Sequence, residues 1–277
     1  MTPHRIAIII PCYNVEQTIL SVLSSFDSVT LGQINEIIVI DNNSSDHTFE
    51  LLKKVSLSDA PISHSLTIIR NQKNYGYGGS QKIAYKYLLS SENTHFMIIH
   101  GDNQGNSDMI AQNFLNELKK NSNTDVILAS RFTSNSNISE YSWIRTRGNQ
   151  FFNFLTYLLT GLNMSDAGSA IICLKTNVLK EIPFTHLDSA FHFHPQLNIL
   201  LYSNHRITIK EIPLSWKDSP VGSNVNIIKY GIKMLNILTR YWINRTIFRK
   251  SPYDHFVTKS DSFSPTFTIF KKPNELN

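Results

Sequence analysis

The 277-residue sequence is poor in cysteine and has no long apolar run. Its two cysteines, Cys12 and Cys173, lie far apart in separate apolar runs, which argues against a disulfide framework or a cysteine-rich zinc site and favours a reducing compartment. The first apolar run, residues 6–10, stops at Pro11 and is too short for a secretory signal. No run approaches the roughly 20 residues that span a bilayer. We therefore expect a cytoplasmic protein without a membrane-spanning segment.

Acidic residues are missing from residues 219–253, a segment that holds six of the 26 basic residues. The rest of the chain has 20 basic and 21 acidic residues, so the net charge of +5 comes from this one segment. A nucleic-acid-binding protein would more often spread positive charge over a face of the whole domain. The pattern therefore argues against nucleic acid and indicates contact with a single anionic surface.

Short β-branched runs alternate with amphipathic stretches over the first 130 residues. The runs lie at 6–10, 36–40, 66–70, 96–100 and 125–129, and the amphipathic stretches near 16–26, 46–56, 79–90 and 108–120. This alternation predicts an α/β fold with a Rossmann-like, mostly parallel sheet and helices on both faces. Ligands of such sheets bind at the carboxyl ends of the strands.

Polar turns follow the first, second and fourth of these runs, at residues 11–14, 41–46 and 101–104, and residues 74–79 are rich in glycine. Taken singly, each has a local explanation, because Ser45 or Asp46 can cap a helix and a glycine cluster can be a simple turn. Together, at one edge of one sheet, they predict a nucleotide site.

Asp102 and Gln104 lie two residues apart just after the fourth run, so in an extended chain their oxygens would point the same way. Such a pair offers two ligands to Mg²⁺ or Mn²⁺, with diphosphate oxygens supplying others. The cation would act as a Lewis acid toward a departing nucleoside diphosphate. The alternative is that Asp102 merely caps the helix that begins near Ser107.

Five ordered motifs resemble the family-two glycosyltransferases of GT-A fold, and most closely the dolichyl- or polyprenyl-phosphate sugar transferases. They lie at residues 10–14, 39–48, 74–80, 100–104 and 129–132, with further matches at 166–170, 191–196 and 212–216. The resemblance implies transfer of a sugar from a UDP- or GDP-linked donor, with Mg²⁺ or Mn²⁺ as cofactor.

The resemblance also implies residue roles. Residues that match the donor-nucleotide site are Pro11, Tyr13, Asn14, Glu16, Asp41, Asn43, Asn74, Gly78, Gly79, Gly101 and Asp102. Asp41 matches the acid that reads the base, and Asp102 with Gln104 matches the metal-holding pair. Arg131 and either Arg145 or Arg147 match a clamp for the acceptor phosphate, and paired guanidiniums suit phosphate chemically.

Three departures from the family pattern bear on activity. His100 stands where the metal motif usually opens with an acid, and Asn42 replaces the second acid of the 41–46 turn. Residues 194–196 also lack the carboxylate base that hydroxyl-glycosylating members carry. A phosphate is already anionic at neutral pH and needs no base, so the third departure favours a phosphate acceptor. If that inference fails, Asp166, Asp188 or His194 could be the base.

The motifs predict a catalytic domain over residues 1–220, with a nucleotide half at 1–130 and an acceptor half at 131–220. Residues 221–250 read as a basic amphipathic helix, with Ile228, Ile232, Leu235, Leu238 and Trp242 on one face, and 251–277 as a polar tail. The helix suits an anionic bilayer surface, although packing on its own domain or on a partner is the alternative. Residues 134–141 are expected to form a loop that closes over the acceptor, or a tolerated insertion.

The combined prediction is an inverting, metal-dependent glycosyltransferase that moves a sugar to a polyprenyl phosphate, peripherally at the inner face of the cell membrane. A transferase that extends a surface glycan at a sugar hydroxyl is the first alternative. The second alternative is a nucleotide-sugar-binding subunit without catalytic activity, which the replacement of acids by His100 and Asn42 favours. A homo-oligomer or a membrane partner subunit is compatible with either.

Overall fold

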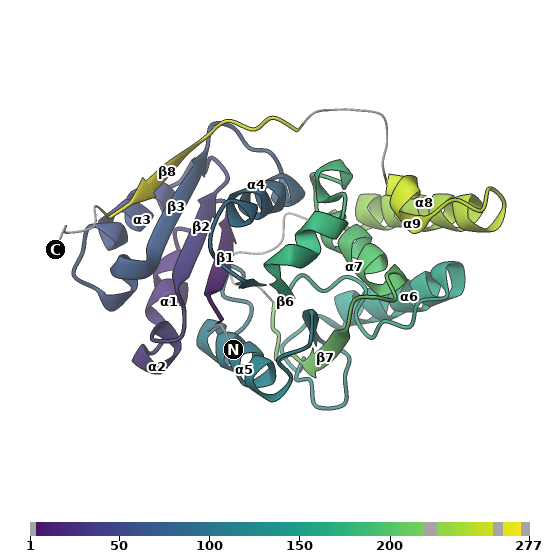
Figure 1. Ribbon diagram of the computed structural model, residues 1–277, viewed down its shortest axis with the longest axis horizontal. Helices are drawn as coiled ribbons and strands as arrows, with labels where there is room; N and C mark the ends of the chain where they lie inside the picture. The colour runs from purple at the N-terminus through teal and green to yellow at the C-terminus, as the bar shows by residue number, and fades with distance from the viewer. Residues whose placement is uncertain (1–3, 219–225, 257–262, 273–277) are drawn as a thin grey trace.

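One mixed sheet runs through the molecule, and helices cover both of its faces (Figure 1). The computed structural model describes residues 4–218, 226–256 and 263–272. Within these residues the sheet has eight strands in the order β7-β5-β6-β4-β1-β2-β3-β8. The strands are β1 (Ile6–Cys12), β2 (Glu36–Asp41), β3 (Leu66–Asn71), β4 (His95–Ile98), β5 (Val126–Ser130), β6 (Ile172–Lys175), β7 (Ile209–Pro213) and β8 (Phe267–Lys271).

The first four strands pair in parallel, with β1 between β2 and β4. Their carboxyl ends therefore lie at one edge, and the strand order reverses at β1, which is where open parallel sheets bind ligands. β6 and β8 pair antiparallel with their neighbours. The expected α/β fold with a mostly parallel sheet is confirmed.

Helices follow the strands at nearly every predicted position. They are α1 (Ile19–Ser24), α2 (Ser28–Leu31), α3 (Thr48–Ser56), α4 (Tyr77–Leu89), α5 (Ser107–Lys120), α6 (Trp143–Thr160), α7 (Phe193–Ser203), α8 (Ile227–Thr246) and α9 (Pro252–Phe256), with short 3-10 helices at Pro61–Ser65, Thr176–Glu181 and Phe184–His186. The stretch expected near 16–26 contains α1, and the short helix α2 follows outside it, begun by the Asp27 side chain, which accepts a hydrogen bond from the Thr30 amide.

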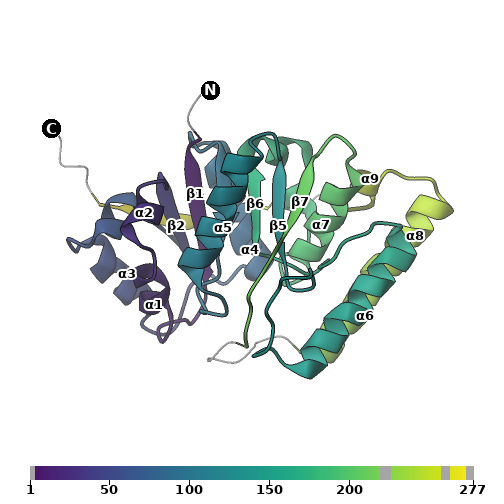
Figure 2. The ribbon, with the colours of Figure 1, turned by 90° about the horizontal axis from the view of Figure 1, so that it is seen from below.

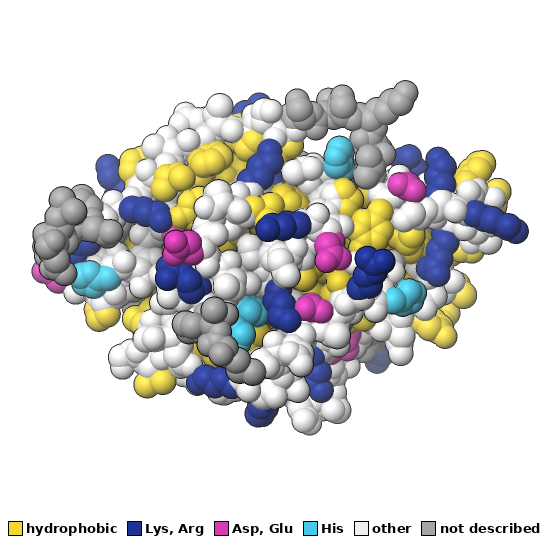
Figure 3. Space-filling view, in the orientation of Figure 1, with side chains coloured by type: hydrophobic (Ala, Val, Ile, Leu, Met, Phe, Trp, Pro, Cys, Tyr) yellow, Lys and Arg dark blue, Asp and Glu magenta, His cyan; other side chains and the backbone are white. Residues whose placement is uncertain are grey.

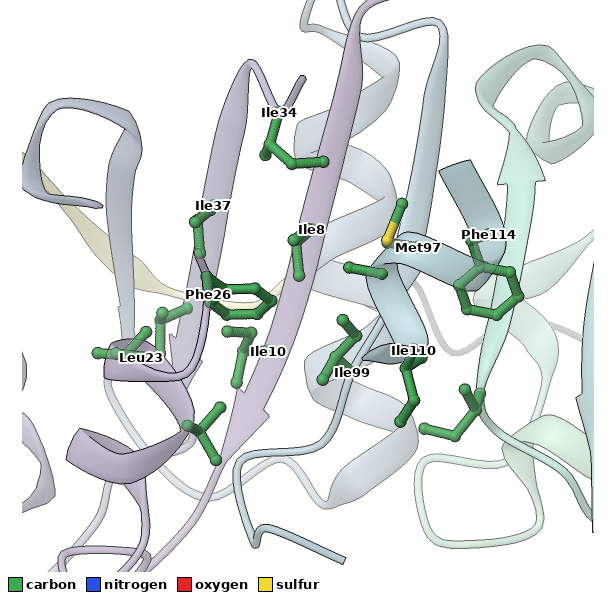
Figure 4. Packing of buried hydrophobic residues seen from close by; sticks show 14 of the residues in the cluster. Ile8, Ile10, Leu23, Phe26, Ile34, Ile37, Met97, Ile99, Ile110 and Phe114 are labelled. Carbon is green, nitrogen blue, oxygen red and sulfur yellow. The ribbon is translucent and has the colours of Figure 1, made fainter. Parts of the chain in front are cut away.

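Alternate residues of the strands build two hydrophobic cores, one on each face of the sheet. Ile8 and Ile10 face α1, α3 and α5 together with Met97 and Phe114, and Figure 4 shows how these side chains pack. The intervening Ala7 and Ile9 face α4 and α7. Burial on both faces explains why these strands are continuous apolar runs rather than alternating ones.

The C-terminal residues contribute a strand that the sequence reading missed. β8 pairs antiparallel with β3 at the sheet edge (Figure 1), and the ring of Phe270 lies 5.3 Å from that of Phe49. Lys271 forms an ion pair with Glu36 at 2.8 Å. The segment expected to be a polar tail is therefore partly structural, and its β-branched and aromatic residues at 266–270 were the overlooked signal.

α6 and α8 contact each other and form a pair that leans away from the sheet (Figure 2). Met234, Leu238 and Tyr241 of α8 are buried against the domain. Ile228 and Ile232 are exposed, so the predicted apolar face divides, and Leu238 belongs to the core. The predicted domain boundary at 220 lies outside the described residues. No helix of the described chain is long and apolar enough to cross a membrane.

Candidate active site

The turns after β1 and β2 are tied together by hydrogen bonds. The Asn14 amide donates to Ser44 Oγ at 3.0 Å, and Asn14 Oδ1 accepts from the Ser45 amide at 2.9 Å. The Glu16 amide donates to Asp46 Oδ2 at 3.1 Å, and Glu16 Oε2 accepts from the His47 amide at 2.8 Å. Asn14 and Glu16 therefore fix the shape of the edge, and Tyr13, between them and the strand, is 39% exposed there.

Asp41 ends β2 as a fully buried carboxylate. It accepts from the Ser44 amide at 3.1 Å and lies 3.5 Å from Arg70 Nε. Burial raises the pKa of Asp41, and the Ser44 bonds and the Arg70 charge offset this rise only in part. Asn43, two residues later, has a left-handed backbone with φ 61°. The expected role of Asp41 as the acid that reads the base stays a prediction.

Asn42, one of the departures from the family pattern, is the centre of a buried amide network. Its Nδ2 donates to Asn74 Oδ1 at 2.8 Å, while its Oδ1 accepts from Asn71 Nδ2 at 2.8 Å and from the Tyr75 amide at 3.0 Å. An aspartate could accept but not donate here. The asparagine therefore has a structural reason, which the sequence alone did not reveal.

Gly78 and Gly79 begin α4 against the segment 188–193. A Cβ on Gly78 would lie 2.3 Å from the Asp188 carbonyl oxygen, and a Cβ on Gly79 would lie 2.6 Å from Tyr75 Cβ. These contacts account for both glycines without a nucleotide. Their expected place under the nucleotide stays a prediction.

His100 lies among aromatic rings at the edge. Its Nε2 is 3.1 Å from Tyr77 Oη, and its ring meets that of Trp216 edge-on at 5.6 Å. Phe191 stacks on Tyr77 at 5.7 Å. Burial lowers the pKa of His100, which the Asp102 charge only partly opposes, so the imidazole is neutral near pH 7. In the resembled family this position usually carries an acid, whereas in this chain His100 supplies a neutral imidazole that can form hydrogen bonds.

The turn after β4 holds Asp102 and Gln104 differently from expectation. β4 ends at Ile98, and Asn103 adopts a left-handed backbone with φ 56°. The chain is therefore not extended from Asp102 to Gln104, and the expectation that strand alternation points both side chains the same way is wrong. Gly101 is fixed by a 2.7 Å bond from Thr18 Oγ1 to its carbonyl oxygen.

The donor atoms of this turn suit a hard cation that is also bound by phosphate. Asp102 offers a carboxylate, and Gln104 Nε2 donates to the Lys217 carbonyl at 3.2 Å, a bond that engages the amide nitrogen and not the oxygen a cation would take. Within the described chain no group of three or more His, Cys, Asp or Glu side chains could hold a metal. A cation here would take its remaining ligands from water or from the oxygens of a bound diphosphate.

Arg131 and Asp166 form a buried two-pronged ion pair. Arg131 Nε and Nη2 donate to the two Asp166 oxygens at 2.7 and 2.8 Å, and the Arg131 amide adds a third bond at 3.1 Å. Asp166 is 0% exposed and the Arg131 side chain 12%. Burial would lower the pKa of Arg131, but the Asp166 charge outweighs it and raises the pKa. An acid held in this way is poorly placed to act as a base.

The two other predicted arginines lie in the first turn of α6. Arg145 Nη1 pairs with Asp218 at 3.0 Å, and Arg147 Nη1 donates to Gln150 at 3.2 Å. Tyr141 Oη lies 3.3 Å from Arg131 Nη1 and accepts from Asn149 Nδ2, which connects Arg131 to the second turn of the same helix. The structure thus brings the arginines to one region without placing them in contact.

The remaining base candidates are also engaged or buried. Lys233 forms an ion pair with Asp188, and although burial alone would raise the pKa of Asp188, this bond lowers it. His194, at the start of α7, is 1% exposed, and burial together with His100 lowers its pKa to about 3. Asp188 is therefore already engaged by Lys233, and burial makes His194 a weaker base than an exposed histidine.

The chain has the GT-A fold of its structural neighbours. The chain belongs to Glycosyl transferase family 2, because residues 7–182 match the sequence model of that family. The expected family and enzyme class are therefore confirmed.

Two characterised relatives act on polyprenyl phosphates, as their names state. An undecaprenyl-phosphate 4-deoxy-4-formamido-L-arabinose transferase of Edwardsiella ictaluri is 26% identical over 245 residues, covering 86% of this chain and 66% of the relative. The chain thus spans slightly less than two thirds of that protein. A UDP-N-acetylglucosamine–dolichyl-phosphate N-acetylglucosaminyltransferase of Methanococcus voltae is 22% identical over 225 residues, covering 77% of this chain and 86% of the relative.

Among solved structures, glucosyl-3-phosphoglycerate synthase of Mycobacterium tuberculosis, in complex with Mn²⁺, UDP and glucosyl-3-phosphoglycerate, superposes with a TM-score of 0.62. The sequence identity is 16%, and the match covers 87% of this chain and 80% of that chain. At this identity the likeness shows the fold alone.

Proposed function

We propose that this glycosyltransferase moves a sugar from a nucleoside diphosphate donor to a polyprenyl phosphate, with inversion at the anomeric carbon. The observation that carries the proposal is the state of the candidate bases: Asp166 is paired with Arg131, Asp188 with Lys233, and His194 is buried with a strongly lowered pKa. A hydroxyl acceptor needs such a base, whereas a phosphate is already anionic at neutral pH. The names of the two relatives support the same acceptor class.

In the proposed reaction a phosphate oxygen of the acceptor attacks the anomeric carbon in line. The new carbon–oxygen bond forms as the bond to the donor diphosphate breaks, and that electron pair leaves with the nucleoside diphosphate. Asp102 and Gln104 would hold Mg²⁺ or Mn²⁺, which when bound neutralises charge on the leaving diphosphate. Asp41 and the turns held by Asn14 and Glu16 would bind the nucleotide, and Arg131 with Arg145 would face the acceptor phosphate.

The acceptor resides in a bilayer, and the α6–α8 pair offers a surface for peripheral contact. Both helices carry exposed apolar residues at helical spacing, namely Ile144, Phe151, Phe154 and Leu158 on α6 and Ile228, Ile232, Leu235 and Trp242 on α8. Basic residues flank those of α8, which suits an anionic membrane surface. We propose that this contact is peripheral and lies at the inner face of the cell membrane.

One assay tests the proposal. The protein is incubated with Mn²⁺, labelled UDP-sugars and either polyprenyl phosphate or a glycan primer, and the mixture is extracted with organic solvent. We expect label in the organic phase and a loss of at least about 100-fold in Asp102→Ala. Asp59→Ala, which removes an exposed carboxylate far along the chain from the turn, is the matched control and should be fully active.

The other outcomes discriminate between the alternatives. Label found only in an aqueous glycan product would overturn the phosphate acceptor and favour glycan extension. Donor binding without any turnover would favour a silent binding subunit.

A further inference from the structure

A basic hollow lies at the end of the α6–α8 pair remote from the active site. It has a volume of about 300 Å³, and its lining includes His205, Arg245, Arg249 and Lys250, which come from the α7–β7 turn and from the end of α8 and the residues after it. No acidic residue of the described chain lines it. The volume is at the lower end of the range for small-ligand pockets. Figure 3 shows Lys and Arg side chains gathered at this end of the molecule, with hydrophobic ones between them.

Two contacts on Nη1 hold the Arg245 side chain in place. Its Nη1 donates to the Thr160 carbonyl, at the end of α6, at 2.8 Å and lies 3.4 Å from Tyr241 Oη. These bonds fix the plane of the guanidinium at the wall of the hollow. A planar guanidinium fixed in this way is suited to two-pronged recognition of phosphate oxygens.

Arg249 has an unusual backbone for its residue type. Its φ is 50°, and the other non-glycine residues of the described chain with positive φ are all asparagines. Asparagine tolerates this left-handed region, whereas arginine adopts it at a cost in free energy. The turn is held by a bond from the Lys250 amide to the Asn244 carbonyl at 2.9 Å. Strained residues of this kind cluster at binding sites.

Among the described residues, no Asp or Glu side chain forms an ion pair with Arg245, Arg249 or Lys250. Asn244 Nδ2 contacts His255 Nδ1 at 2.7 Å, and burial, with Arg240 and Lys250 nearby, lowers the pKa of His255 to about 4, so that this ring is neutral. Ser203 lines the hollow with a hydroxyl that already donates to the Ile199 carbonyl. The local environment is therefore strongly positive and polar.

We propose that this hollow binds a phosphate group, at a site separate from the one where the sugar is transferred. Arg145 and Arg147 lie near the start of α6 and the hollow lies at its end, roughly 20 Å further along the helix. Exposed Ile247 and Phe248 border the same turn, so the headgroup of an anionic lipid and a free phosphate compound both satisfy this chemistry. The membrane source rests on the proposed function, whereas phosphate binding itself does not.

The test compares Arg249→Asn/Lys250→Gln with Lys229→Gln, which removes one positive charge from the other end of α8. Binding of inorganic phosphate and of glycerol phosphate is measured by calorimetry, and flotation is measured with phosphatidylcholine vesicles with or without phosphatidylglycerol. We expect the double variant to weaken phosphate binding by about tenfold or more. Its Tm should be unchanged or higher, because asparagine suits the left-handed turn. Lys229→Gln should bind phosphate as the unaltered protein does.

The vesicle arm separates the two sources. A parallel loss of flotation on phosphatidylglycerol identifies a lipid headgroup, and unchanged flotation with lost phosphate binding identifies a free phosphate compound. Absence of saturable binding to either probe, or an equal loss in Lys229→Gln, would overturn the site. Transfer to detergent-dispersed polyprenyl phosphate should be normal in the double variant, so failure of this site and failure of the proposed function remain distinguishable.

Discussion

Replacing Asp166 by asparagine should destabilise the protein strongly, because it leaves the Arg131 charge buried without its partner. The substitution keeps the volume of the side chain, but it turns one acceptor oxygen into an amide that faces the Arg131 donors. Three charge-assisted bonds between 2.7 and 3.1 Å are affected. Breaking a buried pair by removing one partner costs about 3–5 kcal/mol. For a chain of this size, a loss of 3 kcal/mol lowers Tm by roughly 6–12 °C.

The assay is urea unfolding followed by circular dichroism, with the slope of the transition checked for constancy. Asp218→Asn is the matched control, because the Arg145–Asp218 pair is more exposed and should contribute less than about 1 kcal/mol. Replacing both partners, as Arg131→Met/Asp166→Leu, should recover much of the loss. A change below about 1 kcal/mol in Asp166→Asn would refute the reasoning, because it would show that Asp166 does not compensate the buried Arg131 charge.

Further predictions concern the network, the pH response and the glycines. Asn42→Asp should lower stability by about 1–3 kcal/mol in urea unfolding, since a carboxylate cannot donate to Asn74, and normal stability would contradict the network. The pKa of His194 is about 3 in the folded chain and near 6.5 in the unfolded chain, so the unfolded chain binds more protons between these values. Stability should therefore fall as the pH drops below about 6.5, by up to about 1.4 kcal/mol per pH unit from this group, and His194→Phe should flatten the unfolding free energy measured across that window. Gly78→Ala should lower Tm, because the added Cβ would lie 2.3 Å from a backbone oxygen. Gly148→Ala, in α6, should raise Tm, because nothing lies within 4 Å of the added Cβ. Equal shifts in the two variants would show that close packing is not the reason for Gly78.

Most strands and helices of the nucleotide half were predictable from local pattern. The β-branched runs at 6–10 and 36–40 became β1 and β2 with one or two residues added at their ends. Strands buried on both faces need continuous apolar runs, and this requirement is visible in sequence. β8 was missed because a short edge strand is defined by the neighbour that it pairs with, here β3.

The candidate site was predictable in position and less so in its interactions. Polar turns after β1, β2 and β4 had to meet at one edge once the sheet was parallel. Asn42 could not be assigned, because its three partners come from residues 71–75, after an intervening helix. The extended geometry assumed for Asp102 and Gln104 was wrong, because Asn103 takes a left-handed backbone that no periodicity reveals.

Periodicity and ordered motifs are properties of neighbouring residues, so the fold class and the family could be predicted from the chain before it was folded. Which charges pair and which side chains lose water depends on segments that are remote in the chain. Arg131 pairs with Asp166, 35 residues further along the chain, and His194 becomes neutral because it is buried, with Tyr77 and His100 of other segments nearby. Pairing and desolvation depend on distances of a few ångströms between remote segments, and those distances exist only once the chain has folded.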